Sequence, residues 1–148
     1  MTSKGDYIED LLKEANVTVS GRTWVPGVRN PPGLEDEAIG LSPEAHSSYR
    51  RLVGKLMWLG PIRPDLQFSI KELARCLTSP TIRDEKRLIH LLRYLKATKS
   101  YEIVLGGLQN YRIGQDIGLE ARVDSDWAGC SRTRKSTSRG LYGSWAQR

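Results

Sequence analysis

One carboxylate near the end of the chain is a candidate for metal chemistry. Asp124 closes the alternating, strand-like run Leu119–Val123, and Asp126 follows two residues later. Two-metal sites that act on phosphodiesters need several carboxylates around cations that lie roughly 4 Å apart. No Asp, Glu or His follows Asp126 in the sequence. Asp124 therefore predicts one ligand of an incomplete metal site. Asp126 is a weaker, competing candidate, since alternation places it on the same strand face as Asp124 if the strand continues that far.

A second chemical feature is a block of positive charge. The chain carries 23 Lys and Arg residues against 17 Asp and Glu residues, a formal net charge of +6. Residues 46–100 hold 12 basic and 4 acidic residues, whereas residues 1–45 hold 4 basic and 8 acidic residues. Basic residues bind polyanions by neutralising phosphates and releasing counterions. The block indicates a nucleic-acid partner or, as the alternative, an ordinary solvated helical surface.

Amphipathic helices are expected to carry this charge. Apolar residues recur at helical spacing in four segments, at residues 6–15, about 43–59, about 63–78 and about 83–97. Ser42 and Pro43 form a helix start, and Thr81 with Asp84 forms an approximate capping box before the last helix. In the last three helices the pattern predicts leucine on the buried side and arginine on the solvent side.

The pattern changes after residue 100 to short strands separated by glycine-rich loops. Residues 101–105 and 119–123 are predicted strands, and residues 140–145 could be the returning strand of a hairpin. The predicted fold class is therefore α+β, a helical bundle followed by an incomplete hairpin or sheet. The expected organisation is an N-terminal helix (1–16), a Pro/Gly-rich connector (17–41), a basic three-helix segment (42–100) and a β-rich unit (101–148).

Five sequence blocks occur in one order and at one set of spacings. They are Tyr49–Leu56, Arg63–Leu66, Leu91–Thr98, Asp124–Gly129 and Arg134–Ser138. Together with Tyr7–Lys13 they closely resemble the copia-type retrotransposon Pol polyprotein over nearly the whole chain. One departure is Arg139, since in that family the last block passes directly into glycine and a hydrophobic strand. That departure, and Met1 at a position that would be mid-polyprotein, favour a decayed or fragmentary copy of the element, or a truncated gene model.

The resemblance implies a place for each part of the chain. Residues 1–100 would belong to the thumb or connection region of the reverse transcriptase, and residues 101–148 would begin a truncated ribonuclease H-like domain. Asp124 would be the first ribonuclease H carboxylate, a ligand of Mg²⁺ in the intact enzyme, with the remaining ligands beyond Arg148. The polymerase aspartates are absent because no Tyr-x-Asp-Asp motif occurs. We expect this chain alone to be inactive and to bind no Mg²⁺ stably.

The same resemblance implies that the basic helices contact the phosphates of an RNA–DNA template–primer duplex. The missing fingers and palm, and the rest of the ribonuclease H domain, would be further partners. An inert structural or nucleic-acid-binding remnant is the alternative, and we expect no self-contained nuclease. The predicted nucleic-acid-binding residues are Arg50, Arg51, Lys55, Arg83, Lys86, Arg87, Arg93 and Lys96.

Several remaining residues have more ordinary interpretations. Trp58 and Trp127 could stack on bases, but Trp58 lies on a leucine-lined helix and is expected in the core. His46 and His90 are isolated and are expected to have surface or packing roles. No apolar run approaches the length of a membrane span, and the N-terminus lacks the apolar core of a signal peptide. The sequence therefore predicts an intracellular protein, cytoplasmic or nuclear, that is not secreted.

Overall fold

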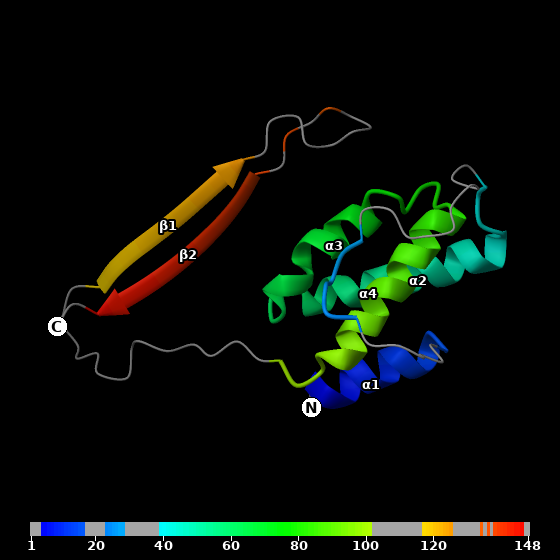
Figure 1. The fold of residues 1–148 in the computed structure, drawn as a ribbon, viewed down its shortest axis with the longest axis horizontal. Coiled ribbons are helices and arrows are strands. Elements are labelled where there is room, and N and C mark those ends of the chain that lie inside the picture. Colours follow the sequence, from blue (N-terminus) through cyan, green and yellow to red (C-terminus); the bar gives the residue numbers. More distant parts are fainter. Residues whose placement is uncertain are drawn as a thin grey trace. The chain divides into compact units, whose positions relative to one another are not determined.

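The computed structural model describes residues 4–16, 23–28, 39–101, 117–125, 134, 136 and 138–146. The chain divides into two compact units, Met1–Ile103 and Val104–Arg148. The first unit contains the helices and the second contains the strands (Figure 1). The elements of the described residues are α1 (Lys4–Glu14), α2 (Pro43–Leu59), α3 (Pro64–Ala74), α4 (Ile82–Ala97), β1 (Ile117–Ser125) and β2 (Ser138–Ala146).

The helices begin where local chemistry favours a start. Ser42 precedes α2 and its hydroxyl accepts a hydrogen bond from the backbone nitrogen of Ala45, while Pro43 occupies the first helical position. Before α4, the Asp84 carboxylate accepts hydrogen bonds from the backbone nitrogen (3.0 Å) and the hydroxyl (2.8 Å) of Thr81. These are the capping interactions that the sequence predicts, and all four helices lie close to their expected positions.

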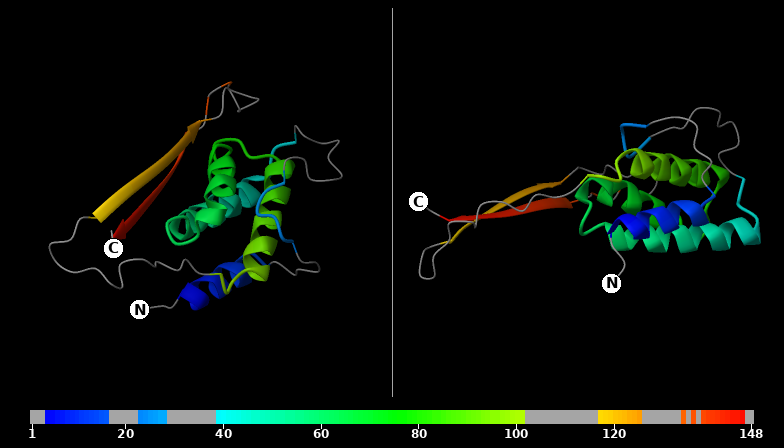
Figure 2. Two further views of the ribbon diagram at one scale, coloured as in Figure 1. Left: turned by 60° about the vertical axis from the view of Figure 1, so that its left-hand side comes forward. Right: turned by 90° about the horizontal axis from the view of Figure 1, so that it is seen from below.

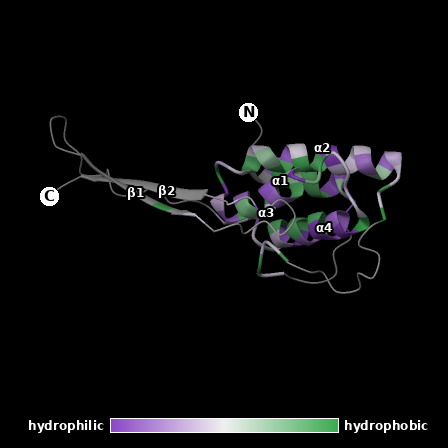
Figure 3. Ribbon diagram, turned by 90° about the horizontal axis from the view of Figure 1, so that it is seen from above, coloured by the Kyte–Doolittle hydropathy of each residue, from purple (hydrophilic) through white to green (hydrophobic). Residues whose placement is uncertain are grey.

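The core of the first unit is built from leucines and other apolar residues on the facing sides of the helices. Each helix carries both hydrophobic and hydrophilic residues along its length (Figure 3). The contacts join α2 with α3, α3 with α4, and α4 with both α1 and α2. The expected apolar stripes are thus confirmed, and Tyr49 joins them with its hydroxyl donating to the Leu73 carbonyl at 2.8 Å. The buried apolar residues are Ile8, Leu11, Tyr49, Leu52, Val53, Leu56, Leu59, Leu66, Ile70, Leu73, Leu88, Leu91, Leu92, Tyr94 and Leu95.

Trp58 is an exception to these assignments. It was expected in the core, but its side chain is 80% exposed. Position 58 falls just beyond the stripe formed by Leu52, Leu56 and Leu59, on the solvent side of α2. The size of an apolar side chain does not by itself decide burial, because the helix face on which it lies does.

The N-terminal helix and parts of the connector pack onto the other helices. α1 lies beside the C-terminal end of α4 in the views of Figures 1 and 2. The Tyr7 hydroxyl donates to the Lys55 carbonyl at 3.0 Å, which links α1 to α2. In the connector, the Val25 carbonyl lies 2.9 Å from Nε2 of His90. His90, for which a surface or packing role was expected, thus contacts the connector.

The predicted α+β fold is wrong, because every apolar core residue of the described chain belongs to a helix. β1 and β2 form an antiparallel two-stranded ribbon, and no further strand pairs with them within the described residues. The described side chains of β1, Val123 and Ser125, are both exposed. A single ribbon has no second layer against which to bury a face, so alternation in sequence does not suffice to build a ribonuclease H-like sheet. Of the expected strand at 101–105, residues 102–105 lie outside the described residues.

No helix in the described part of the chain is both long enough and apolar enough to cross a bilayer.

Candidate nucleic-acid interface

The solvent side of α2 combines positive charge with an exposed aromatic ring. Arg50 and Arg51 are exposed, and Met57 and Trp58 lie seven residues further on, 52% and 80% exposed respectively. Residues three, four and seven apart share one side of a helix. Arg50, Arg51, Gly54, Met57 and Trp58 therefore form a continuous surface, called here the outer face of α2.

Gly54 lies in the middle of this face. A Cβ atom added at Gly54 would meet no heavy atom within 4 Å, so no neighbouring group requires a glycine there. Glycine inside a helix is about 1 kcal/mol less favourable than alanine. The absence of a side chain at Gly54 exposes helix backbone between the arginines and Trp58, and glycine is a residue that permits close approach of a ligand.

Two of the predicted basic residues share one acidic partner. Arg51 Nε lies 2.6 Å from Oε1 of Glu14, and Lys55 forms an ion pair with Oε2 of the same carboxylate. The hydrogen bond from Lys55 holds the pKa of Glu14 below its usual value, with smaller contributions from the charges of Lys55 and Arg51. The structure thus brings Arg51 and Lys55 together at the C-terminal end of α1.

The basic residues of α4 are less uniformly exposed than the sequence suggests. Lys86 and Lys96 are exposed, whereas Arg83, Arg87 and Arg93 are half-buried. Arg87 Nη1 lies 3.5 Å from Oδ1 of Asp84 in the first turn of the same helix. The expectation that all five point into solvent is therefore wrong for the three arginines, because long side chains lay their stems along the helix surface.

The predicted metal ligands are placed only in part. Asp124 lies in β1, where its Cα is paired with that of Arg139 in β2, and Asp126 lies outside the described residues. Within the described ranges, no group of three His, Cys, Asp or Glu residues is arranged to hold a metal ion.

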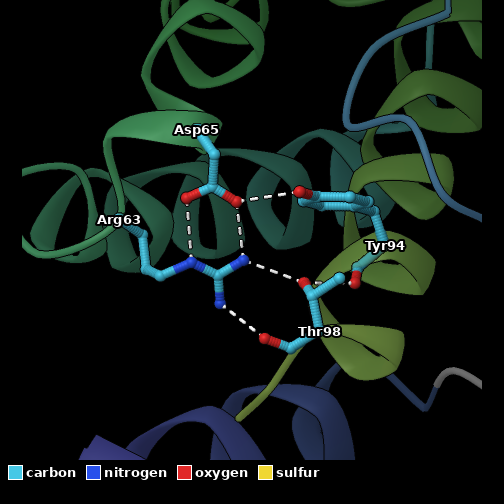
Figure 4. A network of polar contacts seen from close by, with 4 residues as sticks. All are labelled: Arg63, Asp65, Tyr94 and Thr98. Carbon is cyan, nitrogen blue, oxygen red and sulfur yellow. Dashed lines mark hydrogen bonds and ion pairs between the residues drawn. The ribbon is translucent and has the colours of Figure 1, made fainter. Parts of the chain in front are cut away.

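A buried polar network, which the sequence did not predict, joins α3 to α4 (Figure 4). Arg63 is 1% exposed and pairs with Asp65 through two contacts, Nε to Oδ1 at 2.9 Å and Nη2 to Oδ2 at 2.7 Å. Arg63 also donates from Nη1 to the Thr98 carbonyl at 2.9 Å and from Nη2 to the Thr98 hydroxyl at 2.8 Å. The Tyr94 hydroxyl donates to Oδ2 of Asp65 at 3.0 Å.

The network favours the ionised forms of the buried Arg63 and of Asp65, whose side chain is 32% exposed. Burial opposes the charged form of Arg63, but the hydrogen bonds and the charge of Asp65 outweigh burial and raise the pKa of Arg63. The hydrogen bonds from Arg63 lower the pKa of Asp65 against the effect of burial, and Tyr94 adds to the lowering. Burial, with the neighbouring carboxylate, raises the pKa of Tyr94. The Arg-Pro-Asp sequence was the one available signal, because an arginine and an aspartate flanking a helix-starting proline lie close together.

Comparison with curated proteins finds relatives that include two retrotransposon Pol polyproteins. This chain is 30% identical over 127 residues to the retrovirus-related Pol polyprotein from transposon RE1 of Arabidopsis thaliana, an alignment that covers 86% of this chain and 8% of the polyprotein. It is 30% identical over 136 residues to the corresponding polyprotein from transposon RE2, covering 92% of this chain and 9% of the polyprotein. The chain belongs to the copia-type retrotransposon Pol polyprotein family.

Another relative in the same plant is an uncharacterized mitochondrial protein, 35% identical over 92 residues, or 62% of this chain and 36% of the relative. The present chain thus corresponds to a small part of the length of the Pol polyproteins and to about a third of the mitochondrial protein. No protein-family model matches the chain. No solved structure matches it either.

The buried network gives a physical reason for two of the blocks that carry the resemblance to Pol polyproteins. Arg63 and Asp65 come from the block Arg63–Leu66, and Tyr94 and Thr98 come from the block Leu91–Thr98. In this Pol segment the two blocks meet in a single set of hydrogen bonds. These contacts hold α3 and α4 together around the buried guanidinium of Arg63.

Proposed function

We propose that this Pol segment contacts nucleic acid through the outer face of α2. The single observation that carries the proposal is the exposure of Trp58 on the same helix face as Arg50 and Arg51. A large aromatic side chain that is 80% exposed contributes little to the core. Its combination with positive charge matches the two contacts that nucleic acids offer, namely phosphates and base or sugar surfaces.

Each residue of the face has a defined role in the proposal. Arg50 and Arg51 bind backbone phosphates, which requires charge but no particular base sequence. Gly54 permits the sugar–phosphate backbone to lie close to the helix, and Trp58 covers an exposed base or sugar. Stacking of an aromatic ring on an unpaired base, or on a base at the end of a duplex, contributes about 1–3 kcal/mol and tolerates any sequence.

The proposed ligand is an RNA–DNA hybrid duplex, in keeping with the retrotransposon origin of the relatives RE1 and RE2. A thumb-like segment of a reverse transcriptase would hold such a duplex by shape and charge. Lys86 and Lys96 of α4 are exposed, and we propose that they make further phosphate contacts. Asp124 and the Mg²⁺ chemistry of a ribonuclease H domain form no part of this proposal.

Binding of a short RNA–DNA duplex, measured by fluorescence anisotropy over a range of salt concentrations, tests the proposal. We expect log K to fall linearly with log salt, and Arg50→Gln to make the slope shallower by about 0.9, the value for one phosphate contact. Trp58→Ala should weaken binding at every salt concentration by about tenfold, equivalent to about 1.4 kcal/mol.

Matched controls separate the proposed face from general surface effects. Lys13→Gln removes a basic residue from α1, and Trp24→Ala removes a tryptophan that is 66% exposed on the connector. Neither change should alter duplex binding by more than about twofold. Equal losses for Trp24→Ala and Trp58→Ala, or no binding by the unaltered protein at low salt, would contradict the proposed function.

A further inference from the structure

We propose that Glu14 is an internal competitor for nucleic-acid phosphate at Arg51 and Lys55. The inference rests on the proposed function and concerns how the same surface is regulated. An acidic helix, α1, supplies the competing carboxylate from a point distant in the sequence. Binding of a duplex would then exchange one anion, the carboxylate, for another, the phosphate.

The geometry of Glu14 is that of a bound anion. Each of its two carboxylate oxygens is engaged by a different cation, Oε1 by Arg51 Nε at 2.6 Å and Oε2 by Lys55 Nζ. A phosphate held between an arginine and a lysine offers its oxygens in the same way. The site at Arg51 and Lys55 is therefore already arranged for an oxyanion, and Glu14 occupies it.

These ion pairs lie at the surface, where exchange is possible. The side chains of Arg51 and Lys55 are 60% and 38% exposed, while that of Glu14 is 25% exposed. Ion pairs between exposed side chains are weak and are screened by salt. An arriving phosphate therefore does not have to break a buried interaction.

The position of Glu14 in α1 also favours this role over a purely structural one. Glu14 is the last residue of the helix, where the macrodipole disfavours negative charge. α1 is held to the other helices by different contacts, since Ile8 and Leu11 are 0% and 1% exposed. The Tyr7 hydroxyl bonds to the Lys55 carbonyl in addition. Removing the charge of Glu14 should therefore leave the helix in place.

Neutralising Arg51 lowers the positive charge of the outer face of α2. Arg51 is the neighbour of Arg50 and lies seven residues from Trp58. While Glu14 occupies Arg51 and Lys55, Arg50 is the cation of this face that makes no ion pair within the described residues. The ion pairs of Glu14 therefore determine whether Arg51 and Lys55 can bind the phosphates of a duplex.

The test is duplex binding by Glu14→Gln, a change that retains the shape of the side chain and removes its charge. We expect about three- to tenfold tighter binding of a short RNA–DNA duplex at low salt, with a salt slope steeper by about one to two. Glu9→Gln is the matched control, because Glu9 lies on α1 like Glu14 and also forms an ion pair, with Lys99 at 3.2 Å. It should change neither the affinity nor the slope.

A second set of variants tests whether the tighter duplex binding of Glu14→Gln arises at Arg51 and Lys55. In protein that already carries Arg51→Gln and Lys55→Gln, Glu14→Gln should give no further increase in affinity. Thermal unfolding followed by circular dichroism checks that each variant is folded, and Glu14→Ala provides an independent removal of the charge. A gain that persists without Arg51 and Lys55 would overturn the competitor role.

The outcomes distinguish this inference from the function on which it rests. If the unaltered protein binds the duplex, Arg50→Gln weakens binding, and Glu14→Gln binds no more tightly, then only the competitor role of Glu14 is overturned. If neither the unaltered protein nor Glu14→Gln binds at low salt, the proposed function fails and the competitor role fails with it.

Discussion

Arg63 and Asp65 face each other across Pro64 in a two-point ion pair, with Nε to Oδ1 at 2.9 Å and Nη2 to Oδ2 at 2.7 Å. The same guanidinium bonds to the carbonyl and the hydroxyl of Thr98, the residue that follows α4. One arginine thus links the start of α3 to the end of α4. The Tyr101 ring lies 5.6 Å from the Arg63 guanidinium carbon, which adds a cation–π contact where the chain continues beyond the helices.

Arg63→Lys should destabilise the helical unit although it keeps the positive charge. Lysine cannot reproduce the planar arrangement of donors that binds Asp65 and Thr98 together. We expect a loss of about 1–3 kcal/mol in the free energy of unfolding, because buried acceptors lose their partners. Urea denaturation followed by circular dichroism measures this loss. As a control, Arg75→Lys changes an arginine that pairs with Glu72 at 3.0 Å near the surface, and it should cost less than about 0.5 kcal/mol. Equal losses in Arg63→Lys and Arg75→Lys would show that the Arg63 network stabilises the protein no more than an ion pair near the surface does.

The stability of the helical unit should depend on the ionisation of Asp65. Hydrogen bonds from Arg63 lower the pKa of Asp65 in the folded protein below its ordinary value of 3.8. The folded state therefore binds its proton less readily than the unfolded state. The resulting stabilisation is fully present above the unfolded pKa and is lost as the pH falls through the folded pKa.

Urea titrations from neutral to acidic pH test this dependence. Asp65→Asn should lower stability at neutral pH and make its decline below the unfolded pKa shallower than in the unaltered protein. Asp10→Asn, on an exposed part of α1, serves as the control. A decline of the same steepness in Asp65→Asn and in the unaltered protein would assign the acid sensitivity to other carboxylates.

Gly54→Ala should stabilise the protein. The added Cβ meets no heavy atom within 4 Å, and alanine in a helix interior is about 0.5–1 kcal/mol more favourable than glycine. Thermal unfolding should show the gain. In Gly60→Ala the new Cβ would lie 3.3 Å from the Met57 carbonyl oxygen, so this control should not gain as much. If Gly54→Ala is stabilising and also weakens duplex binding, close approach at Gly54 is supported; unchanged binding would remove Gly54 from the interface.

Two truncations on α2 should differ strongly in their effect on the stability of the protein. Leu56 is 0% exposed, and Leu56→Ala should cost about 2–5 kcal/mol of stability. Trp58 is 80% exposed, so Trp58→Ala should change stability by less than about 0.5 kcal/mol. Chemical denaturation of both variants checks the contrast. A large loss of stability in Trp58→Ala would mean that the Trp58 ring packs in the core. The exposure of Trp58, on which the proposed nucleic-acid contact rests, would then be contradicted.

Prediction from sequence was accurate where the signal is local. The helical spacing of Leu88, Leu91 and Leu92 correctly placed the buried side of α4, and Thr81 with Asp84 correctly marked its start. Prediction failed at Trp58, because a tryptophan beside a leucine stripe looks like a core residue until the neighbouring helices are placed. It also failed for the fold class, since alternation in β1 is local whereas a sheet with a core requires other layers.

The sequence by itself determined the four helices and their leucine-lined sides, because helix periodicity and capping depend on residues a few positions apart. Only the tertiary structure decided which charges meet. Arg63 finds Thr98 at a separation of 35 residues, and Lys55 finds Glu14 at a separation of 41. Such pairings depend on how the helices pack, and no local pattern encodes them. They are also what makes Arg63, a basic residue like those of the helix surfaces, a buried structural cation.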